Sequence, residues 1–310
     1  MKYCVLALVA SLGAGQSVVN TITTDLNGHQ VVTAPTVSTD GTHTETSQSI
    51  NGRRVPLEQT ETKVLSEDAN GKQVETIVRK YGPDGQLSST ERVLTDTVKT
   101  PDGSRVNSTT YRSDINGNMA EAQRTITESH QQGAVTRTET VVERPTLNAS
   151  LQTVEKRSAV TETSGDNTHQ DLTVYRRSEN GGFDAAIREV TDVTKAGDQT
   201  IEKTAFYEPR STDALELSRQ TLSTTTKRSD GSEVSEVDLY KASVPGVAQT
   251  TGSPQQLYEQ QIITRDKGPG DTVKETLSVR RPSVSEPNHL GALQKVSETV
   301  CQGKCTPDTR

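Results

Sequence analysis

Few of the reactive side chains in this sequence stand at spacings that catalysis or metal binding requires. Ser, His and Asp all occur, but the Gly-x-Ser-x-Gly turn that presents a nucleophilic serine is absent. The Asp-Gly turns lack the ligand spacing and closing Glu of an EF-hand, and no Gly-rich phosphate loop is present. The histidines are scattered singly. We therefore expect no enzyme activity, no metal site and no cofactor, with calcium on turn carboxylates as the lesser alternative.

One series of charged side chains does recur regularly, and we call it the cation ladder. It consists of Arg92, Arg124, Lys156, Arg188 and Arg219, at successive spacings of 32, 32, 32 and 31 residues. In a stacked β-repeat, equivalent residues line up along the sheet. The ladder has two interpretations: cations that pair with neighbouring Glu on a solvated face, or a ligand-facing row that follows an anionic polymer or envelope surface.

Aromatic residues mark the repeat that positions this ladder. The repeat aromatics are Tyr81, Tyr111, Tyr175, Tyr207 and Tyr240, and Glu143 fills the one place that is skipped. Their steps of 30 to 33 residues lie in the range where internal repeats determine the architecture. Turn pairs such as Asn70-Gly71 and Asp84-Gly85 recur between them and favour tight hairpins. Each repeat therefore predicts two long antiparallel strands.

The composition limits the kind of β-structure that these hairpins can build. Apolar residues make up 29% of the chain and aromatic residues 3%, against about 45–50% apolar residues in ordinary domains when Gly is included. Such a composition also suits disorder, but strand-forming threonines and regular turns oppose that interpretation. We predict an all-β fold, an elongated antiparallel meander of about 16 long strands in tandem hairpin repeats of about 32 residues, single-layer or partly curled. Many weak cross-strand pairs would stabilise it in place of a thick core.

The chain divides into four parts. Residues 1–15 have the basic start, short apolar run and small residues of a signal peptide, so the mature chain is expected to begin near Gln16. Residues 16–48 form an N-terminal segment and edge hairpin, residues 49–301 the tandem repeats with an irregular insertion at 244–258, and residues 302–310 the tail. Signal removal leaves Cys301 and Cys305, for which we predict one disulfide in an oxidising compartment, with two free thiols as the alternative.

The charge balance narrows the range of partners. The net charge is −7 with acids and bases interleaved, so no basic patch for nucleic acid is expected. No stretch approaches the length of a transmembrane helix. We expect a secreted protein that is periplasmic, cell-surface or extracellular, with envelope polysaccharide or a surface protein as its candidate partners.

Two segments carry a resemblance to a known family. Tyr81-Gly-Pro-Asp-Gly-Gln-Leu and Tyr111-Arg-Ser-Asp-Ile-Asn-Gly resemble the YD repeats of RHS-type bacterial surface proteins, in which a Tyr, a polar turn and a Gly begin a β-hairpin. The residue after Tyr is Gly82 or Arg112 here, where that family has Asp. More loosely, the chain resembles exported hairpin-repeat proteins of environmental bacteria. The resemblance implies a β-hairpin architecture and supplies no activity.

Three non-catalytic functions follow from these features. The first is a structural or adhesive protein of the cell envelope or extracellular matrix. The second is a polysaccharide-binding surface, which the scarcity of aromatic residues weakens. The third is a periplasmic lipid carrier or bridge with a curled sheet, which the low aliphatic content weakens. We predict the first, with periplasmic lipid or polysaccharide binding as the alternative.

Overall fold

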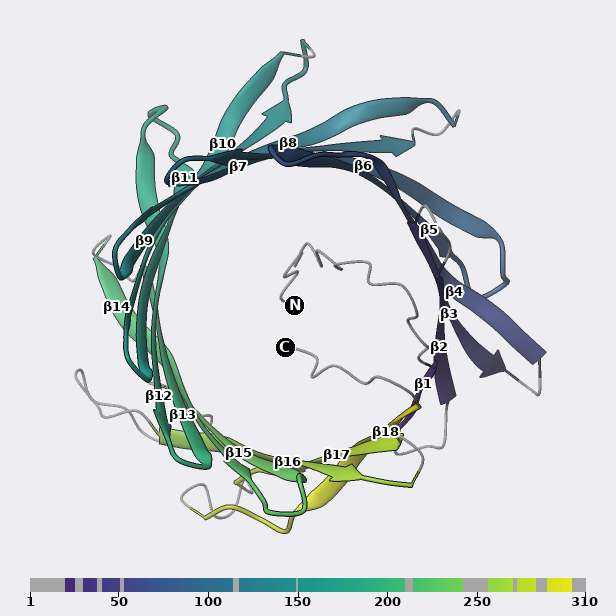
Figure 1. Cartoon of the computed structure of the whole chain (residues 1–310), viewed down its shortest axis with the longest axis vertical. Coiled ribbons are helices and arrows are strands. Elements are labelled where there is room, and N and C mark those ends of the chain that lie inside the picture. The colour runs from purple at the N-terminus through teal and green to yellow at the C-terminus, as the bar shows by residue number, and fades with distance from the viewer. Residues whose placement is uncertain are drawn as a thin grey trace.

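Hairpin follows hairpin along the chain to form one antiparallel sheet that closes on itself (Figure 1). The computed structural model describes residues 20–25, 30–37, 41–50, 53–113, 117–148, 150–209, 214–241, 256–269, 272–282 and 289–302. The strands are β1 (Asn20–Asp25), β2 (Gln30–Val37), β3 (Gly41–Ile50), β4 (Arg53–Glu67), β5 (Gly71–Tyr81), β6 (Leu87–Thr100), β7 (Gly103–Ser113), β8 (Met119–Gln132), β9 (Val135–Pro145), β10 (Leu151–Ser164), β11 (Asn167–Arg177), β12 (Phe183–Ala196), β13 (Gln199–Pro209), β14 (Leu215–Lys227), β15 (Glu233–Lys241), β16 (Gln256–Lys267), β17 (Thr272–Arg280) and β18 (Gln294–Gln302).

The sheet closes because its first and last strands pair with each other. β1 pairs with β2 on one side and with β18 on the other, from Asn20↔Gln302 to Asp25↔Ser297. The expected all-β fold with antiparallel strands in a single sheet is confirmed. The expected open meander of about 16 strands is wrong, because the sheet is an 18-stranded barrel. Closure pairs the two rows of backbone groups that an open sheet would leave at its edges.

The two ends of the barrel differ in their connections. At one end, the tight-turn end, short turns join β4 to β5, β6 to β7, and the even-numbered strands after them to their successors. Gly133 and Gly165 adopt φ angles of 61° and 58° in two of these turns, a conformation that glycine tolerates without steric cost. At the other end, the loop end, the hairpins spread outward (Figure 1). Side chains alternate along each strand of the closed sheet. One set faces the central space, which we call the lumen, and the other set faces the outside.

Backbone hydrogen bonds show which residues face the lumen. Seen from the tight-turn end, as in Figure 1, the strands follow one another counter-clockwise and the even-numbered strands run toward the viewer. Lys99, Thr163 and Lys195 lie on even-numbered strands. The backbone N–H of each donates to a backbone carbonyl in the turn of the preceding hairpin, at 2.7, 3.0 and 3.0 Å. The chirality of L-amino acids links the direction of a residue's N–H to the direction of its side chain. For this strand order and direction, a residue on an even-numbered strand whose N–H points to the preceding strand has its side chain pointing inward. These residues, and those that share their face, line the lumen.

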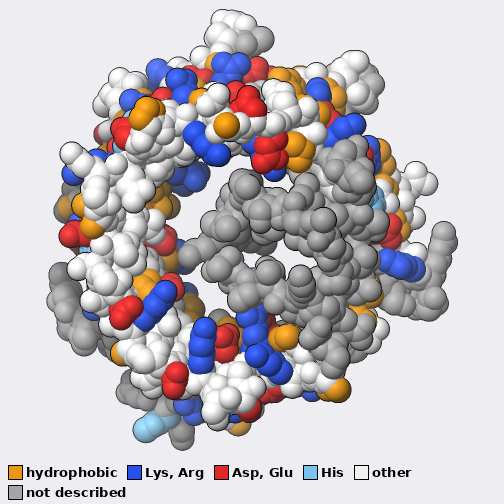
Figure 2. Space-filling model, viewed as in Figure 1, with side chains coloured by type: hydrophobic (Ala, Val, Ile, Leu, Met, Phe, Trp, Pro, Cys, Tyr) orange, Lys and Arg blue, Asp and Glu red, His pale blue; other side chains and the backbone are white. Residues whose placement is uncertain are grey.

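The barrel is wide and has a thin wall. For 18 strands spaced about 4.8 Å apart and tilted by about 40°, the diameter between backbones is about 36 Å. The buried apolar side chains are Val55, Val142, Phe206 and Val279, and the register places all four on the lumen face. Side chains converge on a concave surface and therefore lose more contact with water there. In the space-filling view, charged side chains are spread around the ring (Figure 2).

Several expected segment boundaries lie outside the described residues. These are the signal peptide, residues 244–255 of the expected insertion, and the tail from residue 303. β16 begins at Gln256, inside the range expected for the insertion. Within the described ranges, no helix has the length and apolar character needed to cross a membrane.

Candidate functional site on the barrel wall

The register assigns the cation ladder to two different faces. Each of its first four members lies opposite a repeat aromatic or Glu143 on the outer face: Arg92↔Tyr111, Arg124↔Glu143, Lys156↔Tyr175 and Arg188↔Tyr207. The fifth member, Arg219, pairs instead with Phe206 on the lumen face. Gln220 takes the ladder position in the fifth repeat, opposite Tyr240. The 31-residue step from Arg188 to Arg219 is the cause, because a shift of one residue moves a strand side chain to the opposite face.

Three outer ladder cations are neutralised by nearby carboxylates. Arg92 donates to Glu75 at 2.6 Å, Arg124 lies 3.1 Å from Glu121, and Arg188 lies 2.6 Å from Asp171. Hydrogen bonding to Arg188 lowers the pKa of the Asp171 carboxyl, and the same bond raises the pKa of the guanidinium. These pairs are consistent with cations that pair with neighbouring acids on a solvated face.

The remaining outer cation, Lys156, contacts an aromatic ring on the outer face, and two of the other ladder cations do so as well. The Lys156 ammonium lies 4.6 Å from the centre of the Phe183 ring. Arg92 and Arg188 lie 5.9 and 5.7 Å from the ring centres of Tyr111 and Tyr207, within cation–π range. In the first repeat the hydroxyl of Tyr81 donates to Gln59 at 2.7 Å. The outer face thus carries a row of cations and rings whose contacts stay within the sheet.

The lumen face carries cross-strand hydroxyl pairs, which we call the hydroxyl belt. Its side-chain oxygens lie 2.7 to 3.3 Å apart across neighbouring strands. The pairs are Thr23–Thr299, Thr33–Thr46, Thr62–Thr76, Thr95–Ser108, Thr127–Thr140, Thr191–Thr204 and Thr225–Ser235. Apolar pairs interrupt the belt, for example where Ala159 faces Leu172 and Ile263 faces Leu277.

Toward the loop end, the lumen face carries charged pairs in place of hydroxyls. Glu91 lies opposite Arg112, with Nε and Oε2 2.8 Å apart, and Glu155 lies opposite Arg176 at 3.7 Å. A third guanidinium, that of Arg157, also contacts Glu155 at 2.7 Å. These two acid–base pairs stand at the same height in the first and third repeats, and at that height in the second repeat Arg144 donates to Gln123 at 3.3 Å.

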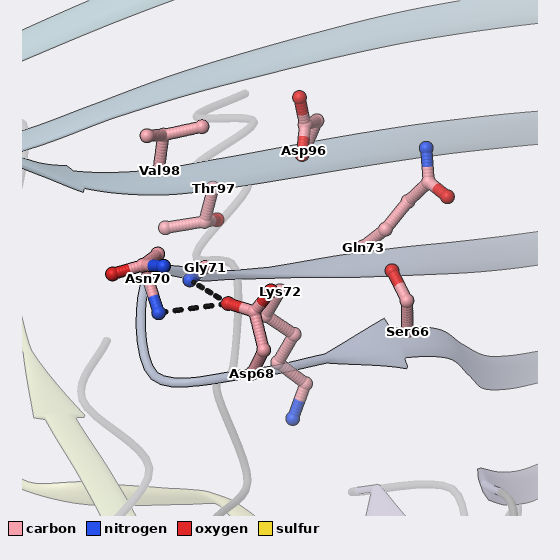
Figure 3. A pocket seen from close by; sticks show the side chains of 9 residues that line it. All are labelled: Ser66, Asp68, Asn70, Gly71, Lys72, Gln73, Asp96, Thr97 and Val98. Carbon is pink, nitrogen blue, oxygen red and sulfur yellow. Dashed lines mark hydrogen bonds between the residues drawn. The ribbon is translucent and has the colours of Figure 1, made fainter.

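Among the described residues no cluster of three or more His, Cys, Asp or Glu side chains is placed to hold a metal ion. A shallow hollow of about 190 Å³ lies at the turn between β4 and β5 (Figure 3). Its carboxylate, Asp68, accepts from the N–H groups of Asn70 and Gly71 at 2.7 and 2.9 Å and so closes the turn itself. The hollow is a feature of the hairpin.

The predicted disulfide is described at one of its two cysteines. Cys301 lies on β18 opposite Thr21 and is disulfide-bonded. Cys305 lies outside the described residues, so the pairing of these two cysteines stays a prediction.

The sequence reasoning missed the hydroxyl belt, although a signal for it exists. Thr95, Thr127 and Thr191 stand at multiples of the 32-residue period, and so do their partners Ser108, Thr140 and Thr204. The same period relates Arg219 to Glu91 and Glu155. A strict count of the repeat would have separated Arg219 from the outer ladder.

Comparison with protein-family models and with curated proteins finds no match for this chain. The resemblance to RHS-type YD repeats therefore stays a proposal about architecture.

Proposed function

We propose that the protein is an exported, non-catalytic barrel with a structural or adhesive role in the cell envelope or extracellular matrix. The observation that carries this proposal is the closed wall, which is polar on both faces and has its backbone paired between the first and last strands. Closure removes the open edge through which strands of neighbouring molecules would pair. The protein would then contact its surroundings through side chains, as a ring or sleeve.

The outer face suits contact with water or a polar surface. Ion pairs such as Arg92–Glu75 and Arg188–Asp171 recur on it in the middle of strands. A surface facing lipid would need an apolar band, because charges near the bilayer centre cost about 2–4 kcal/mol each. We therefore assign the outer face to polar partners, with envelope polysaccharide and surface proteins as the candidates.

Sedimentation of the mature protein with isolated envelope material tests this role. We expect the protein to co-sediment with polysaccharide-rich fragments, and a variant with Arg92, Arg124, Lys156 and Arg188 all changed to Gln to bind less if the outer face makes the contact. Arg219→Gln is the matched control, because it removes a cation from the lumen face. Equal binding by the four-fold variant and the parent would show that the outer ladder serves the scaffold alone. Failure of the parent to co-sediment would overturn the adhesive role.

A second candidate, polysaccharide binding in the lumen, is favoured by the hydroxyl belt. Pairs such as Thr127–Thr140 and Thr191–Thr204 present polar oxygens inward and break up any apolar surface. A lipid would need a continuous apolar wall, so the belt favours a carbohydrate over a lipid. Binding of a neutral glucan by the mature protein tests this candidate, and lipid co-purified in stoichiometric amount would contradict it.

A further inference from the structure

An internal comparison of the repeats isolates one position on the lumen wall where the charge is inverted. The pairs at this height start at residues 91, 123, 155, 187 and 219, which follow the 32-residue period without deviation. In the first and third of these repeats the pair is acid against base, Glu91–Arg112 and Glu155–Arg176. In the fifth repeat the pair is Arg219 opposite Lys241. An arginine thus stands where the first and third repeats have Glu91 and Glu155, and where the second and fourth have Gln123 and Ile187.

Two like charges directly opposite each other destabilise a sheet, so this pair calls for a compensating group. Neither Arg219 nor Lys241 forms a salt bridge with any of the described residues. The side chains of both residues are exposed on the lumen face. The wall therefore presents two adjacent cations without a carboxylate between them.

Aromatic rings hold these two cations in place. The Arg219 guanidinium lies 4.1 Å from the centre of the Phe206 ring, which is buried. The Lys241 ammonium lies 4.1 Å from the centre of the Tyr258 ring. Each ring faces one side of its cation and leaves the other side open to the lumen, so the cations are positioned before a ligand arrives.

The acids around the pair are turned to other contacts. Glu259 is buried and accepts from Arg281 at 2.5 Å. Burial and the Glu259 charge raise the pKa of the Tyr258 phenol, and the nearby Arg219 and Arg281 charges act in the opposite direction. Three cations thus gather around this phenol with one carboxylate, which already has a partner.

Further acids stand at the loop side of the pair. Glu208 and Glu216 lie opposite each other on β13 and β14. Neither makes a described salt bridge to Arg219 or Lys241. Arg219, Lys241 and Arg281 are thus matched in number by Glu208, Glu216 and Glu259, but among the described residues no salt bridge joins an acid to Arg219 or Lys241.

The hydroxyl belt borders the same two cations. Two residues along β14 from Arg219, Thr221 lies opposite Thr204, whose hydroxyl is 3.1 Å from that of Thr191. Thr204 is buried, so a ligand seated on the cations would meet the half-buried hydroxyl of Thr221 on its tight-turn side. Sugar hydroxyls exchange hydrogen bonds with such a surface, and the carboxylate of an acidic sugar suits the cations.

We propose that Arg219 and Lys241 form a lumen site for the carboxylate of an acidic polysaccharide. The inference rests on the second candidate function above, because it names the class of polysaccharide that the lumen would bind. Phe206 and Tyr258 position the two cations, and Thr221 contacts the sugar. An inorganic anion would share the charge recognition and lack the hydroxyl contacts.

Calorimetric titration of the mature protein at low salt tests the site, with an oligogalacturonate, a neutral glucan oligomer and inorganic phosphate as probes. Arg219→Glu restores the acid–base pair of the first and third repeats, so we expect it to fold and to weaken oligogalacturonate binding about tenfold or more. Arg112→Gln is the matched control, because it removes a lumen cation at the same height that already has a carboxylate partner. We expect its affinity to stay within about twofold of the parent.

Each outcome of the titration decides between the proposals. Oligogalacturonate binding that Arg219→Glu weakens and Arg112→Gln preserves supports the site. An equal loss of oligogalacturonate affinity in both variants would show that the lumen attracts anions in general, and so would phosphate binding as tight as that of oligogalacturonate. Either result would overturn the sugar site. If the parent binds the neutral glucan but not oligogalacturonate, the acidic site is wrong and lumen binding survives. If it binds neither, both fail.

Discussion

Closure of the barrel predicts that proline is harmful at two consecutive positions of its first strand. Thr23 and Thr24 lie on β1 between β18 and β2. The backbone N–H groups of consecutive strand residues point to opposite neighbours, so one of these two points to β18 and the other to β2. In a closed barrel each substitution, Thr23→Pro and Thr24→Pro, removes one ladder hydrogen bond and leaves a carbonyl without its donor.

The expected cost follows from the hydrogen bond and its orphaned acceptor. The net loss of the bond is about 0.5–1.5 kcal/mol and the unpaired acceptor adds about 1–3 kcal/mol, so each variant should lose about 2–4 kcal/mol. For a chain of this size, that loss lowers the melting temperature by roughly 3–6 °C. Thermal unfolding followed by circular dichroism measures both variants against the parent.

An open sheet gives a different result for the same two variants. With β1 as an edge strand, one of the two N–H groups would face solvent, and proline there would leave the melting temperature unchanged. A parent-like variant beside a destabilised one would therefore refute closure through β1 and β18.

A cross-link provides a second measurement of the same seam. The hydroxyls of Thr23 and Thr299 lie 3.1 Å apart, so cysteines at these two positions should form a disulfide within one chain under oxidising conditions. The linked chain should migrate faster than the reduced one in a denaturing gel. A covalent dimer as the main product would place the seam between two copies.

Three further outcomes are expected from the wall. Thr127→Val and Thr140→Val should each cost about 1 kcal/mol or less, and a double-mutant cycle should show coupling of the same order, because their hydroxyls pair at 3.1 Å; additive losses would contradict the pairing. Hydrogen bonding to Arg188 lowers the pKa of Asp171, so its contribution to stability should be present above the unfolded pKa of about 3.9 and be lost as the pH falls through the lower folded value. Arg188→Gln should raise that pKa in an NMR titration, and an unchanged pKa would contradict the assignment. Val142→Ala should cost about 1–2 kcal/mol in chemical denaturation, since Val142 is 4% exposed on a thin wall that can partly relax, and a parent-like midpoint would show that the lumen face is not packed.

The sequence determined the local structure and the unit that repeats. Threonine-rich segments between Asn-Gly and Asp-Gly turns favour strands and hairpins through local backbone preferences, which need no knowledge of distant residues. The 32-residue spacing from Glu143 to Tyr175 and on to Tyr207 likewise fixes which residues are equivalent. The all-β, antiparallel, single-sheet fold follows from these signals alone.

Tertiary structure decided the closure and the contents of each face. The contact between Thr23 and Thr299 joins residues 276 positions apart, and no local preference selects it; the accumulated twist and tilt of the intervening strands bring the two ends together. Closure in turn gives every side chain an inside or an outside. It separates Arg219 from Arg188 because a one-residue change in spacing reverses the face of a strand residue. Types and spacings of residues were therefore legible from the sequence, whereas the lumen, and with it the candidate binding surface, exists only because the sheet closes.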